Sequence, residues 1–167
     1  LRAYKNNVVG TGIKASPIVE GNEELDRKVT ELWKEWTTDP EYIDFMGTKT
    51  LGAIQSLIVK ALVESGECLV EVRRARKSKY PYRLQVMEAD FIDTTKNDLT
   101  PKPDGSTVQF GLKLDRNGRV LGYYLYDQHP GDAVITQRKS RFVSRDLVFH
   151  LYEEDRPGQL RGVPWGT

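Results

Sequence analysis

Three carboxylates that lie close together are the first candidates for chemistry. Glu88, Asp90 and Asp93 cluster where an alternating apolar stretch ends. Metal-dependent nucleases use such carboxylates to hold magnesium against a phosphate. Those enzymes also place a Lys or His at a set offset, and none is recognisable here. Acidic residues are ordinary at strand ends, so we expect surface groups and keep the nuclease as an alternative.

The remaining chemically active side chains are few and scattered. Cys68 lies in an alternating apolar stretch, which predicts a buried and inert thiol. His129 falls in a loop, and His150 stands at offsets from Asp146 and Glu153 that do not bring all three to one face of a strand. We therefore expect no catalytic residue, no metal site and no cofactor.

The most conspicuous charge feature is the basic run 73-RRARKSKYPYR-83, in which two tyrosines flank a proline. Cations interleaved with aromatic rings occur in nucleic-acid-binding surfaces. They are equally common in solvated loops between strands, where edge lysines discourage aggregation. We expect a solvated loop or a subunit contact, with a DNA contact as the alternative. The candidate residues are Arg73, Arg74, Arg76, Lys77, Lys79 and Arg83.

The composition excludes several classes of protein. The 167 residues suit one domain. The 25 Lys and Arg residues nearly balance 24 Asp and Glu residues, whereas a dedicated nucleic-acid binder shows a clear basic excess. A single cysteine permits no internal disulfide bond. No apolar run approaches the roughly 18–20 residues that cross a bilayer, so we expect no membrane partner.

Two helices and then several strands must position these residues. Apolar residues at helical spacing predict one helix from the N-cap Asn22 to the residue before Asp39, with Trp33 and Trp36 on its core-facing side. A second, well-buried helix is expected from about residue 48 or 50 to 65, ending at a left-handed Gly66.

After the second helix the apolar period becomes two, which predicts strands. An Asp-Arg-Asn-Gly turn at 115–118 predicts a hairpin. The order predicts an α+β fold with two N-terminal helices packed on a mostly antiparallel β-meander. The expected strands are 68–72, 82–86, 108–114 and 120–126, with shorter extended segments at 8–9, 18–19, 91–92, 133–135 and 146–151.

The closing stretch, 152-YEEDRPGQLRGVPWGT-167, is too rich in Pro and Gly for a regular helix or central strand. Pro164 suits the first turn of a further helix. Because the chain also begins at Leu1 rather than Met, we expect an internal piece of a longer protein.

This stretch resembles the phage portal proteins of the lambda family, in which an "FHLY…RPGQ-RGVPW" block precedes a long helix toward the stem. Similar blocks occur in the same order at NVVGTGI (7–13), at W-x-x-W followed by Asp44, at SGE (65–67), at LQVMEAD (84–90) and at DRNGR (115–119). The residues singled out in this match are Trp33, Trp36, Gly66, Glu67, His150, Arg156, Pro157, Gly158, Gln159, Arg161, Gly162, Pro164 and Trp165.

The resemblance implies a structural subunit of a dodecameric ring at one vertex of the virion, assembled in the host cytoplasm. Double-stranded DNA would pass through the ring, and terminase, capsid and head-completion proteins would bind it. Residues 1–167 would form part of such a subunit, its outer wing, without the stem, clip and crown. Another head–tail or baseplate structural domain is a further alternative.

A near-zero net charge suits a DNA conduit, because tight phosphate contacts would stall the DNA. A ring also needs two different complementary faces on each subunit. The basic run and the acidic stretch Glu153-Glu154-Asp155 are the candidates.

Overall fold

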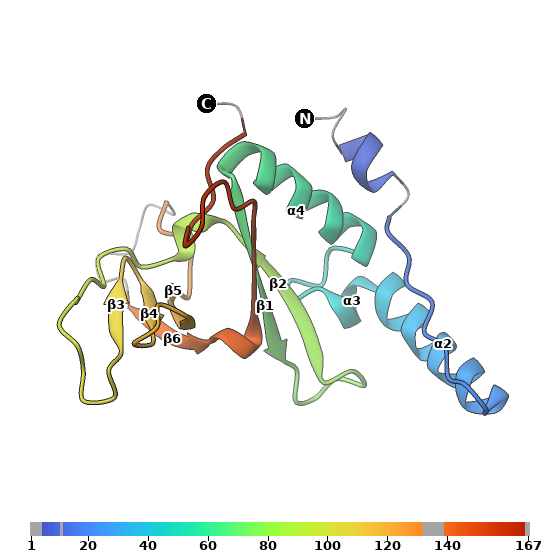
Figure 1. Ribbon diagram of the computed structural model, residues 1–167. Helices are drawn as coiled ribbons and strands as arrows, with labels where there is room; N and C mark the ends of the chain where they lie inside the picture. The colour runs from blue at the N-terminus through green and yellow to red at the C-terminus, as the bar shows by residue number, and fades with distance from the viewer. Residues whose placement is uncertain (1–4, 11, 132–138, 166–167) are drawn as a thin grey trace.

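A computed structural model describes residues 5–10, 12–131 and 139–165 of the chain. Two antiparallel sheets enclose the core, and helices cover the outer face of the first sheet (Figure 1). The fold is α+β, as the sequence predicts. The antiparallel strands divide between two sheets, and the last strand returns to the first sheet.

The helices lie in the first part of the chain. A π-helical turn, η1 (Lys5–Val9), replaces the predicted extended segment at 8–9. It is followed by α2 (Glu23–Thr38), α3 (Pro40–Ile43) and α4 (Leu51–Ser65). The predicted caps are confirmed: the Asn22 side chain accepts a hydrogen bond from the Leu25 N–H, and Gly66 ends α4 with a φ of 78°.

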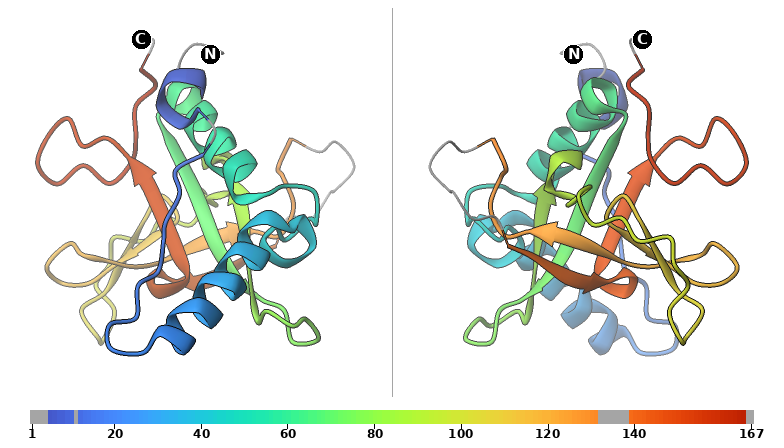
Figure 2. Two further views of the ribbon diagram at one scale, coloured as in Figure 1. Left: turned by 90° about the vertical axis from the view of Figure 1, so that its right-hand side faces the viewer. Right: turned by 90° about the vertical axis from the view of Figure 1, so that its left-hand side faces the viewer.

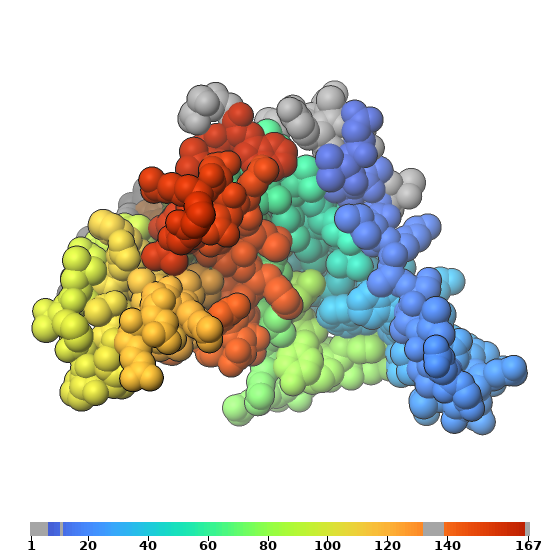
Figure 3. Space-filling model, in the orientation of Figure 1, coloured from blue at the N-terminus to red at the C-terminus, as the bar shows by residue number. Residues whose placement is uncertain are grey.

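The burial of the helices differs from the prediction. No residue of α2 is buried, and this helix projects from the body at one corner (Figure 3). Trp33 and Trp36 are half-buried and contact each other, so their prediction as core residues is wrong. In α4 only Ile54 and Ala61 are buried, so the prediction of a well-buried helix is also wrong. They lie seven positions apart, which makes one narrow stripe on the face toward the sheet.

The first sheet has the order β2-β1-β7 and carries α4 on its outer face. Its strands are β1 (Glu67–Arg74), β2 (Tyr82–Met87) and β7 (Val148–Tyr152). A 3-10 turn, η3 (Arg145–Leu147), replaces the start of the predicted strand 146–151. Another, η2 (Ala89–Phe91), takes the place of the extended segment expected at 91–92.

The second sheet has the order β3-β4-β5-β6. Its strands are β3 (Thr107–Gln109), β4 (Leu112–Leu114), β5 (Val120–Tyr126) and β6 (Ser140–Ser144). The predicted strand 108–114 is wrong, because a two-residue turn at Phe110 and Gly111 breaks it into β3 and β4. The hairpin turn at 115–118 is confirmed by the bond from the Gly118 N–H to the Asp115 carbonyl. The strand expected at 133–135 lies outside the described residues.

The core fills the space between the two sheets. None of the helices in the described ranges is long and apolar enough to cross a membrane. The buried core residues are Leu69, Met87, Ile92, Leu112, Leu114, Tyr123, Leu125, Val143 and Val148.

Candidate functional site

The closing segment, residues 153–163, folds back beside the start of β1 and the end of α4 (Figure 2). Glu67, the first residue of β1, lies at the centre of this contact and is only 3% exposed. The Arg161 guanidinium donates to it from Nε and Nη2 at 2.9 and 2.6 Å. The Gly162 N–H donates at 3.0 Å, and His150 Nε2 lies 2.9 Å from the carboxylate. These four residues, which we call the Glu67 cluster, join β1, β7 and the closing segment.

The electrostatics of the Glu67 cluster favour the ionised carboxylate. Burial by itself raises the pKa of Glu67, because a charged group loses its water. The hydrogen bonds from His150, Arg161 and the Gly162 N–H outweigh burial and hold the pKa at about 2. Glu67 is therefore ionised at neutral pH and pairs with Arg161, which makes the cluster a structural ion pair.

The backbone approaches very closely on the other side of Glu67. A Cβ atom at Gly66 would lie 2.1 Å from the Val163 carbonyl carbon, and one at Gly162 would lie 2.1 Å from the Gly66 carbonyl oxygen. Both distances are impossible for a real side chain, so any substitution must displace the closing segment. The SGE and RGVPW blocks contain glycines because their backbones touch.

The middle of the closing segment is held by its own hydrogen bonds. Gln159 Oε1 accepts from the Asp155 N–H at 3.1 Å, and Gln159 Nε2 donates to the Arg161 carbonyl at 2.6 Å. The Tyr152 hydroxyl donates to the Gln159 carbonyl at 2.8 Å, and the Gly158 N–H donates to Glu154 at 2.9 Å. The segment is therefore a fixed loop, although it has no regular secondary structure.

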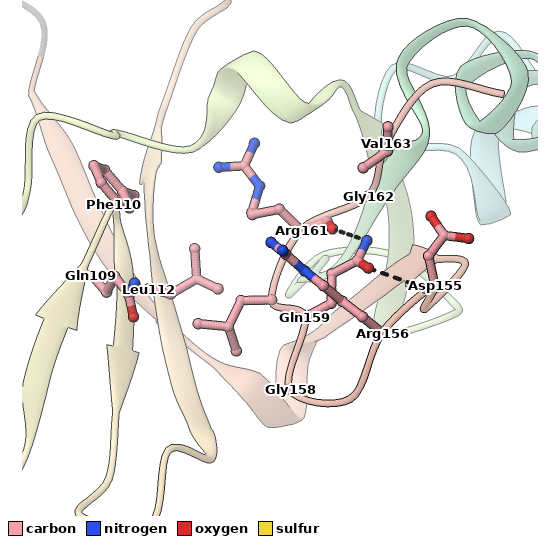
Figure 4. Close-up of a pocket in the computed structure, with 11 residues that line it drawn as sticks. Gln109, Phe110, Leu112, Asp155, Arg156, Gly158, Gln159, Arg161, Gly162 and Val163 are labelled. Carbon is pink, nitrogen blue, oxygen red and sulfur yellow. Dashed lines mark hydrogen bonds between the residues drawn. The ribbon is translucent and has the colours of Figure 1, made fainter. Parts of the chain in front are cut away.

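A groove of about 550 Å³ runs between the closing segment and the β3–β4 hairpin (Figure 4). Phe110 at the hairpin turn and Val163 in the segment are both about half exposed. Asp155, Arg156 and Gln159 line the groove from the other side, where Figure 4 shows their side chains. The groove combines an apolar wall with charged groups and contains no cluster suited to catalysis among the residues that line it.

The W-x-x-W…D block forms a second contact between elements. The Trp36 indole N–H lies 3.1 Å from the Tyr42 carbonyl and 3.2 Å from the Tyr82 carbonyl. Asp44 is buried, and its carboxylate accepts from the Thr48 N–H and hydroxyl at 2.9 and 3.0 Å. Together they attach the connection between α2 and α4 to the start of β2.

The basic run divides into two groups. Arg73 pairs with the buried Glu71 at 3.2 Å, Lys79 pairs with Glu35 at 2.6 Å, and Arg83 is half-buried on β2. The first two are paired within the fold, whereas the buried Arg83 Nε has no hydrogen-bond partner among the described residues. The others, Arg74, Arg76 and Lys77, are exposed, and their side chains form no ion pair or hydrogen bond within residues 5–10, 12–131 and 139–165.

The carboxylates predicted for a nuclease do not form one site. Asp93 is buried and accepts hydrogen bonds from the Ser140, Thr95 and Tyr126 hydroxyls. Glu88 and Asp90 are exposed beside His129, close enough for the three to hold a metal ion. However, His129 Nδ1 accepts from the Gly131 N–H, which leaves the proton on the Nε2 that faces Glu88. That tautomer favours a hydrogen bond to Glu88 over coordination of a metal.

Sequence reasoning missed the ion pair that joins the two sheets. Glu71 on β1 is buried and accepts from Arg141 Nη2 on β6 at 2.6 Å, while Arg141 Nε donates to Asp127 at 2.6 Å. Glu67 and Glu71 alternate on β1 and therefore share the inward face. Two carboxylates on a strand's buried face were the available signal, but the cations that reach them from other elements, Arg141 and Arg161, lie 70 and 94 residues away.

Cys68 and His150 have the structural environments that the sequence predicts for them. Cys68 is fully buried, and burial raises the pKa of its thiol to about 12, so it is unreactive at neutral pH. The His150 ring is buried between Tyr123 and Tyr152 at 5.5 and 4.7 Å and contacts Glu67. Its position is structural.

Comparison with known proteins identifies a family over the whole chain. The family model described as "Phage portal protein, lambda family" matches residues 1–167. A probable portal protein of Halomonas phage phiHAP-1 is 25% identical over 174 aligned residues, which cover 98% of this chain and 33% of that protein. The chain thus spans about a third of the length of this relative. The chain belongs to the lambda family of phage portal proteins.

Proposed function

We propose that this chain is part of a structural subunit of a phage portal ring, located at one vertex of the virion, through which DNA enters and leaves the head. The match of the family model to residues 1–167 carries this proposal. The chemistry of the site supports it, because the motif residues serve packing and ion pairing. The subunit itself would catalyse no reaction and bind no cofactor.

Within that subunit we assign residues 1–167 to the outer wing. The resemblance puts the RGVPW block just before a stem helix, and the remaining two thirds of the phage phiHAP-1 relative leave room for stem, clip and crown. The Glu67 cluster would then fix the direction in which the chain leaves the wing. The motif residues Arg161, Gly162 and Gly66 would act as this anchor.

The partners follow from the same assignment. Twelve copies would form the ring during assembly in the host cytoplasm, and terminase, capsid and head-completion proteins would bind to it. Double-stranded DNA would pass through the channel. The net charge of +1 supports this role, because a conduit must not hold the phosphate backbone tightly.

Negative-stain electron microscopy of the full-length subunit tests the proposal. We expect rings with a central channel. Monomers alone, across a range of salt and protein concentrations, would contradict it. The same preparation should not cleave DNA in the presence of magnesium. Cleavage that is lost on Asp90→Ala would instead support the nuclease alternative, for which Glu88, Asp90 and His129 are the adjacent groups.

A further inference from the structure

Two loops at opposite corners of the molecule carry opposite charge (Figure 2). One is the tip of the β1–β2 hairpin, where Arg74, Arg76 and Lys77 are exposed. The other is the start of the closing segment, where Glu153, Glu154 and Asp155 are exposed. We call them the basic tip and the acidic loop.

The charged side chains of both loops form no ion pairs with other described residues of the same subunit. Arg73 and Lys79 have internal carboxylate partners, whereas no ion pair is found for the three cations of the basic tip within the described ranges. In the acidic loop only Glu154 forms a side-chain hydrogen bond to another described residue, and its donor is the neutral Gly158 N–H. Arg156 follows directly, so residues 153–156 carry a net charge of −2 against +3 on the basic tip.

Both loops are held in position before any partner arrives. The basic tip is fixed by the Lys79 and Tyr80 contacts to Glu35 and by the bond from the Ala75 N–H to the Pro81 carbonyl. The acidic loop is fixed by Gln159, which accepts from the Asp155 N–H. Association therefore need not order the backbone of either loop, which favours binding between such loops.

We propose that the basic tip of one subunit docks on the acidic loop of the next subunit around the ring. This inference rests on the proposed ring. A cyclic assembly needs two different complementary surfaces on each copy, and these two loops satisfy that need with opposite charge and opposite position.

Charge reversal in the full-length subunit tests the pairing. Arg74→Glu, Arg76→Glu and Lys77→Glu together should abolish rings, and so should Glu153→Lys, Glu154→Lys and Asp155→Lys together. In an equimolar mixture of the two variants the contacts match only where the variants alternate, so the test combines both reversals in one chain. Rings should return in that combined variant, seen by electron microscopy and by the mass of the assembly.

Two controls separate this effect from other causes. The triple reversal of the exposed Lys96, Arg116 and Lys139 to Glu makes the same change in net charge as the basic-tip reversal, but elsewhere, and rings should persist. Circular dichroism and urea unfolding of each variant should stay close to those of the unaltered subunit, because none of the reversed groups is buried and the Glu154 bond to the Gly158 N–H is exposed.

Proximity gives a second readout. An Arg76→Cys and Glu154→Cys pair should form disulfide-linked multimers under mild oxidation, and neither single variant should, since the native Cys68 is buried. Rings that survive either reversal would overturn the inference. So would a combined variant that forms no rings when each single-loop reversal has abolished them. So would intact rings that lose DNA binding on reversal of the basic tip, since they would assign it to DNA. An unaltered subunit without rings would instead count against the proposed function.

Discussion

Glu67 lies where an ionised carboxylate is stable only if its neighbours supply the hydrogen bonds that water would otherwise give. Arg161, His150 and the Gly162 N–H supply them. A buried ion pair contributes little compared with an apolar replacement, but removal of one partner leaves the other without compensation. Glu67 therefore acts mainly by fixing the position of the closing segment.

Glu67→Gln should lower the free energy of unfolding at pH 7 by about 3 kcal/mol, because Arg161 loses its anion. The exposed Glu64→Gln, which loses only a surface pair with Lys60, should cost less than about 0.5 kcal/mol. Urea unfolding of both variants measures this. Equal losses would show that burial of the pair is unimportant.

The same substitution predicts a pH dependence. The folded chain lowers the pKa of Glu67 from 4.5 to about 2, so this stabilisation is present above 4.5 and is lost as the pH falls toward 2. The difference in unfolding free energy between the unaltered chain and Glu67→Gln should shrink across that window. Comparing the two chains cancels other carboxylates. A difference that stays constant from pH 5 to pH 2 would contradict the ion pair.

At the scale of elements, the closing segment and the end of α4 fit together through backbone contact. Gly66 and Gly158 have nearly the same φ, 78° and 79°, but only Gly66 has atoms where a Cβ would lie. Gly158→Ala should therefore cost only the left-handed conformation, about 1–2 kcal/mol. Gly66→Ala should cost at least about 1 kcal/mol more. Thermal unfolding distinguishes them, and equal costs would mean that the segment yields freely.

The β3–β4 turn offers a stabilising change. Phe110 is the one non-glycine residue with positive φ, 45°, in the described part of the chain. Asn adopts this conformation readily and is favoured before Gly in two-residue hairpin turns. Phe110→Asn should therefore raise the free energy of unfolding by about 0.5–1 kcal/mol relative to Phe110→Ala, measured by urea unfolding. If Asn and Ala behave alike, the backbone at this turn is unstrained.

Local signals in the sequence predicted the elements well and their partners poorly. Asn22 and Gly66 determine helix ends through bonds to residues only three or four positions away, so their patterns are readable. The alternation through residues 108–114 misled, because Val108 is opposite Lys113, which puts it on the other face from Leu112 and Leu114. The alternation of apolar residues continues without a break through the two-residue turn at Phe110-Gly111, so it gives no sign of the turn.

The candidate site shows the same division. The motif residues of the closing segment were visible as a block, and their resemblance to a family gave them a context. Their convergence on Glu67 was not visible, because the contacts join residues 83 to 95 positions apart. The incomplete burial of Trp33 and Trp36 was equally hidden, since helical spacing shows which residues share a face and not what covers it.

At the scale of the whole molecule, Arg141 connects the two sheets. It reaches from β6 to Glu71, which is buried on β1. Arg141→Met should lower the free energy of unfolding by about 3 kcal/mol, because Glu71 loses its strongest donor. Adding Glu71→Met should recover much of that loss, since no unpaired charge then remains buried.

Urea unfolding of the two single variants and the double variant measures the coupling. Lys102→Met, which breaks an exposed pair with Asp98, is the matched control and should cost less than about 1 kcal/mol. Strictly additive losses at Glu71 and Arg141 would show that the two sheets are held together by apolar packing alone.

The separation of the two ends of the Glu67 contact has a consequence for how the chain folds during synthesis. The bond from Arg161 to Glu67 closes a loop of 94 residues, and β7 pairs with β1 across a similar span. The helices, the β1–β2 hairpin and the β3-β4-β5 ladder need only nearby partners and can form while the ribosome is still translating. One edge of β1 therefore stays unpaired until β7 has been synthesised. Of these elements, the closing segment is the last to bind to β1.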